Sequence, residues 1–505
     1  MSARFILAID QGTTGTTALV MAPDGETLGR ANREFPQHFP RPGCVEHEPA
    51  EIWASVTAAI AGALSSAGVG GDGIRAIGIT NQRETTLLWD RRSDEPVHRA
   101  IVWQDRRTAD RCEALKQAGH EQRVRDVTGL VIDPYFAGTK LAWLLDSVDG
   151  ARARAERGEL AFGTVDSYVI WKLAGGGAAN APHVTDVTNA SRTLLMHLKD
   201  RQWDDGMLEL FGIPAAVLPT IVPSAGICAR TRNVPGLPDG IPIAGVAGDQ
   251  HAALFGQGCL EPGDAKCTYG TGAFVLVSTG SQVVKSRFGL LSTVGWQIGS
   301  EAVYALEGSA FIAGAAVQWL RDGLKLIASA DQIEALARSV PSSDGVVFVP
   351  ALSGLGAPHW DPHARGLITG ITRGTTAAHL ARATLEAIAL EVGELINAMA
   401  DDLGRPLARM RVDGGASAND LLMQLQSDVS DLLIERPAEL ESTARGAAML
   451  AAVGAGVFGS GAEAGKMLKI ASTFHRTLPD APRAALWRGW HDAVRRTKAQ
   501  STPSA

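Results

Sequence analysis

Residues 8–20 read AIDQGTTGTTALV, two apolar runs separated by an aspartate and a loop of glycine and threonine. The apolar runs on both sides of this loop have the composition of β-strands. PDG (23–25) then turns the chain into ETLGRANREF (26–35), which has the pattern of a third strand. We therefore expect the chain to begin with three antiparallel strands, with Asp10 and several hydroxyl groups at the tip of the first hairpin.

A helix and a buried strand follow this hairpin. In EPAEIWASVTAAIAGAL (48–64), Ile52, Val56, Ile60 and Leu64 recur every four residues, and this spacing predicts an amphipathic helix. IRAIGITN (74–81) has the composition of a buried strand that ends in polar residues. The order of strands, helix and strand predicts an α/β domain.

The second half of the chain repeats this plan. AKCTYGTGAFVLVSTG (265–280) is again a strand, a glycine-rich loop and a strand, and TAAHLARATLEAIALEVGELINAM (376–399) has a broad apolar stripe at helical spacing. At 505 residues the chain is also too long for a single core. We expect two related domains, residues 1–253 and 254–505.

Composition and charge exclude several classes of function. The net charge is -7 and the basic residues are scattered, so we expect no binding to nucleic acid. No apolar stretch reaches the length of about 20 residues that spans a bilayer, so we expect no membrane insertion and a cytoplasmic location. The five widely spaced cysteines favour reduced thiols over disulfides or a zinc site. Residues 497–505 are expected to be frayed or disordered.

The two glycine-threonine loops suggest phosphate binding. Backbone amides of such a turn, with the hydroxyls of Thr13, Thr14 and Thr16, can surround phosphate oxygens, and Asp10 can hold Mg²⁺ directly or through water. A second loop, YGTG (269–272), occurs at the equivalent point of the repeat. Either loop alone is equally consistent with an ordinary tight turn. Neither loop matches the P-loop pattern of nucleoside triphosphatases.

A third glycine-rich site has a different form. LARMRVDGGASANDLLMQLQSDV (407–429) passes from a strand through Gly414 and Gly415 into a helix. Glycines at the start of a helix allow a flat ligand such as adenosine to approach the backbone closely. A turn that needs glycine only for its backbone conformation is the alternative.

Together these loops and the motifs between them resemble the FGGY carbohydrate kinases. The motifs that carry the resemblance are DQGTTG, GITNQRETTLLWD, AIVWQDRRT, GLVIDPYFAGTK, VTDVTNASRTLL, AGVAGDQHAALFGQ, YGTGAF, LEGSAFIAGAAVQWLRD, GLGAPHWDPHARG and VDGGASAN. They run in this order from about residue 5 to about residue 455. The resemblance implies a duplicated actin-like, ribonuclease H-like fold with the active site in the cleft between two domains. It also implies phosphorylation of a primary hydroxyl of glycerol by MgATP.

The resemblance assigns the acceptor site position by position. It implies that glycerol is held by Arg83, Glu84, Tyr135, Asp249 and Gln250, with Trp103 and Phe274 packed against its carbon chain. A triol needs both donors and acceptors, and the adjacent Arg83 and Glu84 supply one charged group of each kind. Asp249 is expected to act as the base that takes the proton of the attacking hydroxyl.

The nucleotide site is assigned in the same way. The implied contacts are Thr13, Thr14, Gly15, Thr17, Thr271, Gly314, Gln318, Gly415 and Asn419, with Asp10 near the Mg²⁺ ion. Thr17 stands where many members have arginine, so a guanidinium contact to the phosphates is missing and the affinity for ATP is expected to suffer. Residues 231–243 lack the glycine-rich basic loop that binds fructose 1,6-bisphosphate in some members, so we expect no response to that effector. We also expect a homo-oligomer, a dimer or a tetramer.

Other interpretations of these residues remain open. Arg83 and Glu84 could form a solvated surface pair, Trp103 and Phe274 could belong to the core, and Asp249 could cap a helix. A related kinase acting on a pentulose is the nearer functional alternative. A non-catalytic actin-like nucleotide switch is the more distant one, and such a switch would keep the phosphate loops without needing the Arg83, Glu84 and Asp249 constellation.

Overall fold

Two five-stranded units with the same topology form most of the central sheet of the computed structural model, which describes residues 4–361, 363–439 and 441–501. The strands of the first unit are β1 (Phe5–Gln11), β2 (Gly15–Met21), β3 (Thr27–Glu34), β5 (Ile74–Asn81) and β14 (Pro242–Gly248), in the spatial order β3-β2-β1-β5-β14. Those of the second are β15 (Asp264–Tyr269), β16 (Ala273–Gly280), β18 (Glu301–Ala310), β21 (Arg409–Asp413) and β22 (Leu433–Pro437), in the order β18-β16-β15-β21-β22. In the first unit β2 is antiparallel to β1, and β1, β5 and β14 are parallel to one another. In the second unit β16 is likewise antiparallel to β15, and β15, β21 and β22 are parallel. The expected duplication and the three-stranded start are therefore confirmed.

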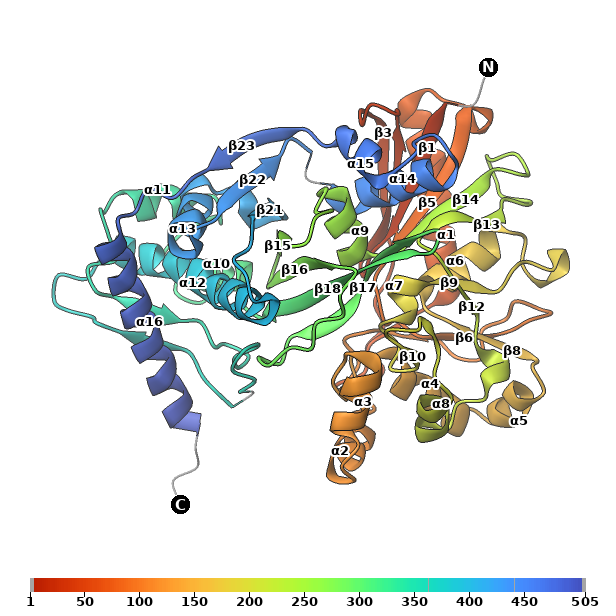
Figure 1. Ribbon diagram of the computed structural model, residues 1–505, viewed down its shortest axis with the longest axis horizontal. Coiled ribbons are helices and arrows are strands. Elements are labelled where there is room, and N and C mark those ends of the chain that lie inside the picture. The colour runs from red at the N-terminus through yellow and green to blue at the C-terminus, as the bar shows by residue number, and fades with distance from the viewer. Residues whose placement is uncertain (1–3, 362, 440, 502–505) are drawn as a thin grey trace.

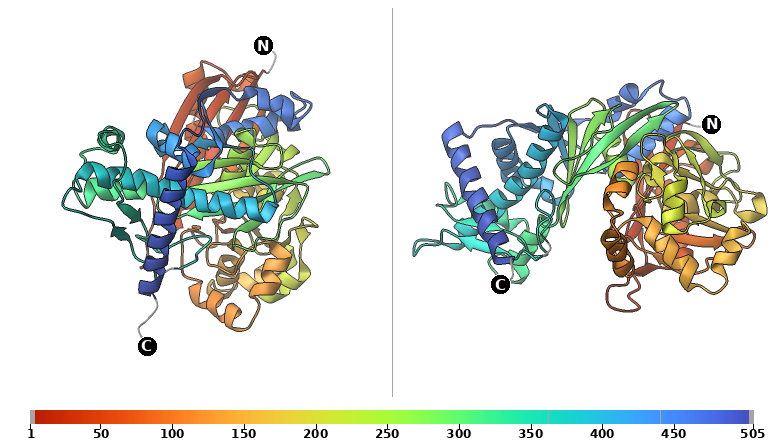
Figure 2. Two further views of the ribbon diagram at one scale, coloured as in Figure 1. Left: turned by 60° about the vertical axis from the view of Figure 1, so that its left-hand side comes forward. Right: turned by 60° about the horizontal axis from the view of Figure 1, so that its bottom comes forward.

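The two units join through two further strands. β13 (Ala225–Arg230) pairs with β14, β17 (Leu291–Ile298) pairs with β18, and β13 meets β17 at the single pair Ala225 and Ile298. With β23 (Ile470–Phe474) at the far edge, the result is a continuous sheet of thirteen strands. Figures 1 and 2 show the green strands of this middle region bridging the two halves.

A crossover helix covers each unit. The first is α1 (Pro49–Ala67), and Ile52, Val56, Ile60 and Leu64 are all buried against the sheet, as their spacing predicts. By length and composition α1 could also span a membrane, but its apolar residues belong to the core of the first half. The second crossover helix is α12 (Ala377–Leu403), whose inner face fills the core of the second half.

The remaining elements surround these two units. In the first half they are β4 (Glu46–His47), β6 (Leu87–Asp90), β7 (Ala100–Ile101), α2 (Ala109–Gln117), α3 (Glu121–Thr128), α4 (Ala137–Ser147), α5 (Ala151–Glu156), β8 (Leu160–Gly163), α6 (Val165–Leu173), β9 (Val184–Asp186), α7 (Val187–Ala190), β10 (Met196–His197), β11 (Gln202–Trp203), α8 (Asp205–Phe211) and β12 (Thr220–Val222). In the second half they are α10 (Gly314–Asp322), α11 (Gln332–Arg338), β19 (Val347–Val349), β20 (Leu367–Thr369), α13 (Asp420–Ser430), α15 (Gly461–Ala464) and α16 (Asp480–Ser501). α16 continues to Ser501, so the disorder expected for residues 497–501 is wrong, and 502–505 lie outside the described residues.

Two helices meet where the halves join. α9 (Asp249–Gly256) follows β14, and α14 (Ser442–Gly454) follows β22. A Cβ atom on Gly446 would lie 1.8 Å from the carbonyl oxygen of Ala252, and one on Gly256 would lie 2.1 Å from that of Ser442. Because no side chain fits in these spaces, the two helix backbones can touch only at glycine. The boundary expected near residue 253 falls inside α9 and stays a prediction.

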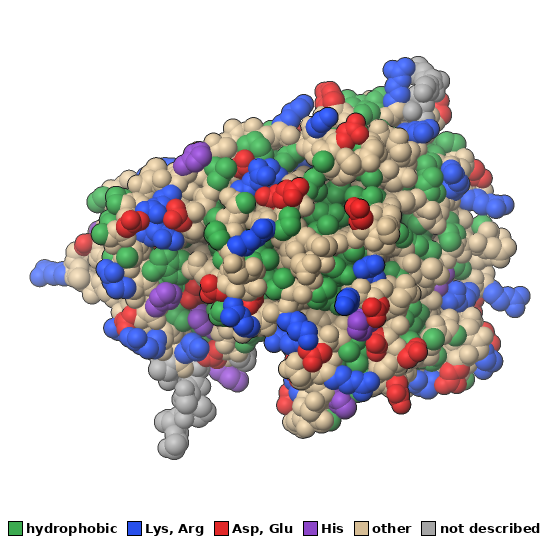
Figure 3. Space-filling view, viewed as in Figure 1, with side chains coloured by type: hydrophobic (Ala, Val, Ile, Leu, Met, Phe, Trp, Pro, Cys, Tyr) green, Lys and Arg blue, Asp and Glu red, His purple; other side chains and the backbone are tan. Residues whose placement is uncertain are grey.

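Surface charges are mixed on the face seen in Figure 3. Lysine and arginine side chains alternate with aspartate and glutamate across both halves, without a large area of one sign. A basic patch would be the electrostatic signature of a nucleic-acid binding surface. This face has none.

The contact between α9 and α14 gives a direct test of the fold. Replacement of Gly446 by alanine should lower the free energy of unfolding by about 1–3 kcal/mol, because the added methyl group would overlap the backbone of α9. Thermal unfolding measures the change. Gly374→Ala is the matched control, since its added methyl would be 3.7 Å from the nearest atom. Equal melting temperatures for the two variants would contradict the close packing of α9 on α14.

Candidate active site

A cavity of about 640 Å³ lies between the two halves, beside the tips of the two glycine-threonine hairpins. All seven residues expected to bind the acceptor line it: Arg83, Glu84, Trp103, Tyr135, Asp249, Gln250 and Phe274. Thr13 from the first hairpin and Thr271 from the second also reach it. The structure thus brings residues far apart in the sequence to one cavity, with walls from both halves.

Arg83 and Glu84 lie just beyond the carboxyl end of β5. Both side chains are buried, with 3% and 1% exposure, so they are not a solvated surface pair. Glu84 has a φ of 61°, a left-handed backbone conformation that is unfavourable for a glutamate. Such strain persists only where the surroundings hold the residue, and it is concentrated at functional sites.

Asp249 begins α9, directly after β14, and its side chain is one-third exposed to the cavity. Its Oδ1 lies 3.1 Å from Nε of Arg83 and accepts a hydrogen bond of 2.6 Å from the backbone amide of Gln250. Oδ2 makes no hydrogen bond within the described part of the chain. One carboxylate oxygen is therefore fixed, and the other is free to accept a proton.

Aromatic rings form another part of the wall. The rings of Trp103 and Tyr135 meet edge to face, with centroids 5.7 Å apart. Nε1 of Trp103 donates a 3.0 Å hydrogen bond to Oγ1 of Thr13, so this ring connects the wall of the cavity to the first hairpin loop. Phe311 and Trp360 also line the cavity and are 40% and 45% exposed.

Arg192 and Glu307 are buried residues of the site that were not predicted from the sequence. Nη1 of Arg83 lies 2.5 Å from Oε2 of Glu307, and Nη2 of Arg192 lies 3.0 Å from Oε1. Burial alone would raise the pKa of Glu307, but Arg192 and Arg83 outweigh it and hold this pKa well below its usual range. Both residues lie inside motifs of the family resemblance, NASRTLL and LEGSAF, where a single charge among small and apolar residues is the only signal.

Gln250 is held from the second half. Nζ of Lys266, on β15, donates to Oε1 of Gln250 and, at 3.0 Å, to Oγ1 of Thr268. Lys266 is fully buried, and burial lowers its pKa. The side chain of Gln250 is thereby oriented by a buried cation that the sequence analysis did not identify.

The residues expected to bind nucleotide are spread around this cavity. Thr14, Gly15 and Thr17 belong to the first hairpin, Gly314 and Gln318 to α10, and Gly415 and Asn419 to the turn before α13; none of these seven lines the cavity itself. The amide of Gly314 donates 2.9 Å to the carbonyl of Gly270, which fixes α10 against the second hairpin. A Cβ on Gly415 would meet nothing within 4 Å, so the backbone there is open to a ligand. The Asn419 side chain caps α13 by accepting from the amide of Leu422.

Asp10 lies at the end of β1 with its carboxyl group near two others. Desolvation by burial, together with the nearby negative charges of Asp249 and Glu441, raises its pKa to about 8. A divalent cation would relieve this repulsion. Within the residues that the structure describes, no group of three or more histidine, cysteine, aspartate or glutamate side chains could hold a metal ion alone. Mg²⁺ is commonly bound by one or two carboxylates together with water and substrate phosphates, and Asp10 fits a site of this kind.

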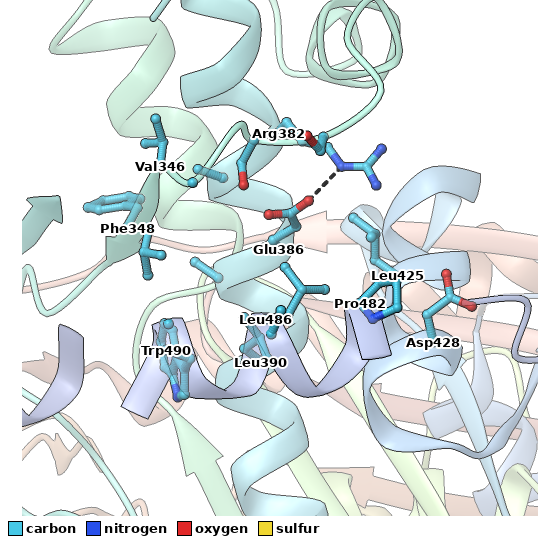
Figure 4. A pocket seen from close by; sticks show the side chains of 18 of the residues that line it. Val346, Phe348, Arg382, Glu386, Leu390, Leu425, Asp428, Pro482, Leu486 and Trp490 are labelled. Atoms are coloured by element: carbon cyan, nitrogen blue, oxygen red, sulfur yellow. Dashed lines mark hydrogen bonds and ion pairs between the residues drawn. The ribbon is translucent and has the colours of Figure 1, made fainter. Parts of the chain in front are cut away.

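A second cavity, of about 360 Å³, lies in the C-terminal half between α12 and α16. Figure 4 shows its apolar wall of Val346, Phe348, Leu390, Leu486 and Trp490, with Arg382 paired to Glu386 on one side. None of the predicted site residues lies in this second cavity.

Comparisons with known proteins agree with this architecture. Models of the FGGY family of carbohydrate kinases match residues 5–256 with the N-terminal domain and 265–455 with the C-terminal domain. A glycerol kinase of Myxococcus xanthus is 56% identical, covering 98% of this chain and 99% of its own, and one of Alkalilimnicola ehrlichii is 58% identical, covering 90% and 91%. The structure of Plasmodium falciparum glycerol kinase with ADP is similar with a TM-score of 0.92 at 34% identity, over 98% of both chains.

The raised pKa of Asp10 predicts a pH-dependent stability. Between the ordinary value of 3.8 and the folded value of about 8, the folded protein binds one more proton than the unfolded chain, so the free energy of unfolding falls as pH rises. Asp10→Asn removes this titration. In EDTA, the melting temperature of the variant minus that of the wild type should rise as the pH increases from about 5 to about 8.

Asp149→Asn, at an exposed position, is the control and should follow the wild-type profile. A constant difference in melting temperature between Asp10→Asn and wild type across this range would mean that Asp10 is already ionised at the lower pH.

Proposed function

Because the chain belongs to the FGGY family of carbohydrate kinases, we propose that it transfers the γ-phosphoryl group of ATP to a primary hydroxyl of glycerol, giving sn-glycerol 3-phosphate. The observation that carries this proposal is the position of Asp249. It touches Arg83 in a cavity that also holds Glu84, Trp103 and Phe274. That set can bind a small polyol beside a free carboxylate oxygen.

The acceptor is held by complementary groups. The guanidinium of Arg83 donates hydrogen bonds and the carboxylate of Glu84 accepts them, so adjacent hydroxyls of a triol find both kinds of partner. Only Oε1 of Glu84 has a hydrogen-bond partner among the described residues, which leaves Oε2 for the acceptor. Trp103 and Phe274 cover the carbon chain and keep water from the reacting hydroxyl.

Asp249 is the base in this proposal. Its Oδ2 takes the proton of the attacking hydroxyl as the oxygen of that hydroxyl forms a bond to the γ-phosphorus and the bond from this phosphorus to the β,γ-bridging oxygen breaks. ADP leaves with the electron pair of the broken bond. Arg83 holds Oδ1 of Asp249, so the base is oriented by the same side chain that binds the acceptor.

The nucleotide is proposed to lie across the two hairpin loops. Thr13, Thr14 and Thr271 would face its phosphates, and the open backbone at Gly415 would receive the adenosine. Asp10 is the proposed ligand of Mg²⁺, which neutralises charge on the β- and γ-phosphate oxygens when bound. We further expect a dimer or tetramer that works in the cytoplasm.

Consumption of ATP that depends on glycerol tests this function. A purified sample should form ADP rapidly with glycerol and slowly without it, in a coupled assay run with glycerol, xylulose, ribulose or no acceptor. Equal ADP formation with and without every acceptor would support a nucleotide switch instead of a kinase. Preference for a pentulose would keep the kinase and reject glycerol.

The role of Asp249 predicts a large loss of turnover. Asp249→Asn keeps an oxygen for the contacts with Arg83 and Gln250 but cannot take a proton, so kcat should fall by about 10²-fold or more. The KM for glycerol and the melting temperature should change little. Glycerol-dependent ADP formation measures the effect, and turnover close to wild type would remove Asp249 from the role of base.

The aromatic wall predicts selectivity for a three-carbon acceptor. A pentulose would press two extra hydroxyls against Trp103 and Phe274, and leaving both unpaired costs about 2–6 kcal/mol. Glycerol should exceed xylulose in kcat/KM by about 30-fold or more. Trp103→Ala should narrow this ratio. Trp103→Phe, which keeps an aromatic ring but loses the hydrogen bond to Thr13, should largely preserve it. Equal ratios in all three proteins would exclude the wall as the cause of the selectivity.

A further inference from the structure

Four buried charges alternate around one side of the acceptor cavity. Arg83 contacts Glu307 through both terminal nitrogens, at 2.5 and 3.3 Å. Arg192 contacts the same carboxylate at 3.0 Å and Oε1 of Glu84 at 2.7 Å. Nε of Arg83 lies 3.8 Å from that Glu84 oxygen, which closes the ring. We call these four residues the charge ring.

The charge ring is removed from water. The side-chain exposures are 3% for Arg83, 1% for Glu84, 0% for Arg192 and 4% for Glu307. A buried ion that loses its partner is costly because neither water nor another charge replaces it. Each member is therefore held in place by its two neighbours in the ring.

Both carboxylate oxygens of Glu307 accept hydrogen bonds from arginines of the charge ring. Oε2 faces Arg83, and Oε1 is shared between Arg83 and Arg192. Although Glu307 lines the cavity, its oxygens are already committed to two arginines. Glu307 can therefore influence a bound acceptor through Arg83, whose Nε contacts Asp249 and whose Nη2 also donates a 3.3 Å hydrogen bond to the hydroxyl of Tyr135.

Arg192 acts on the opposite side of the ring. It binds Oε1 of the strained Glu84, whose Oε2 has no hydrogen-bond partner among the described residues. Its guanidinium also lies 5.1 Å from the ring centroid of Phe136 and 5.7 Å from that of Tyr135. Arg192 thus fixes both the carboxylate and one aromatic ring of the acceptor wall while lining no part of the cavity itself.

The ring also joins the two halves of the molecule. Arg83, Glu84 and Arg192 belong to the N-terminal half, whereas Glu307 lies on β18 of the second unit. Two arginines of one half converge on a single carboxylate of the other. β18 thus supplies, from the second half, the carboxylate that contacts Arg83 most closely.

We propose that Arg192 and Glu307 are positioning residues for the acceptor substrate, and that the carboxylate of Glu307 makes the acceptor site complete only when the two halves are in contact. The proposal rests on the acceptor site described under the proposed function. It assigns the effect of both residues to acceptor binding and not to nucleotide binding, because their contacts go to Arg83, Glu84 and Tyr135.

Steady-state kinetics of Glu307→Gln test this proposal. The variant should raise the KM for glycerol by about tenfold or more, because it loses about one charge-assisted contact. The KM for ATP should change by less than about threefold. Glu307→Asp keeps the charge and should recover part of the affinity for glycerol. Arg192→Lys should behave like Glu307→Gln, since one ammonium group cannot serve Glu84 and Glu307 together.

Asp264→Asn is the matched control. Asp264 is a buried carboxylate of the same sheet that pairs with Arg409 at 2.9 Å, but it begins β15 at the end opposite to the hairpin loop. It should lower the melting temperature and leave the KM for glycerol unchanged. The proposal is overturned if Glu307→Gln and Asp264→Asn affect both KM values alike, or if Glu307→Gln leaves the KM for glycerol at the wild-type value.

Thermal stabilisation by glycerol distinguishes a variant that fails to fold from a folded variant whose acceptor site is wrongly positioned. The wild type should melt at a higher temperature with glycerol, and folded Glu307→Gln should need about tenfold more glycerol for the same shift. If Glu307→Gln does not fold, Arg192→Lys and Glu307→Asp carry the comparison. If the wild type prefers a pentulose, the proposed function fails, and an unchanged KM for that pentulose in the same variants would overturn the positioning role as well.

Discussion

The proposed acceptor site depends on the ion pair between Arg83 and Glu307, which crosses from one half of the molecule to the other. Both side chains are almost fully buried, and their nearest atoms are 2.5 Å apart. Removing one partner of a buried pair leaves an uncompensated charge and typically costs about 3–5 kcal/mol. This contact therefore links the arrangement of the two halves to the geometry of the proposed acceptor site.

Asp249, the proposed base, is fixed by a second constraint, the packing of α9. Asp249 begins this helix, and Gly256 ends it against α14 of the other half. Because the backbones of α9 and α14 touch at Gly256 and Gly446, α9 cannot shift without moving α14 as well. Asp249 is thus held at one end by helix packing and at its side chain by Arg83.

The repeated hairpins made the fold predictable, because strand composition, turn residues and the stripe of α1 are local signals. The strands near 5–35, 74–81 and 265–280 and the helices that begin at Pro49 and Ala377 follow from them. The continuous sheet of thirteen strands does not follow from local signals, because the two halves of the sheet are joined by one bridge between Ala225 and Ile298. Arg192, Lys266 and Glu307 could not be found by pattern either, because a single charge in an apolar stretch shows its role only through partners that are distant in the sequence.

A crystal structure with glycerol and a non-hydrolysable ATP analogue tests most directly whether both halves build one acceptor site around Asp249. The account predicts glycerol between Arg83 and Glu84, with Trp103 against its carbon chain and the Arg83–Glu307 pair intact. One terminal hydroxyl should lie about 2.6–3.2 Å from Oδ2 of Asp249, on the side facing the γ-phosphate. Glycerol bound without contact to Asp249, or a γ-phosphate that no hydroxyl can reach, would contradict it.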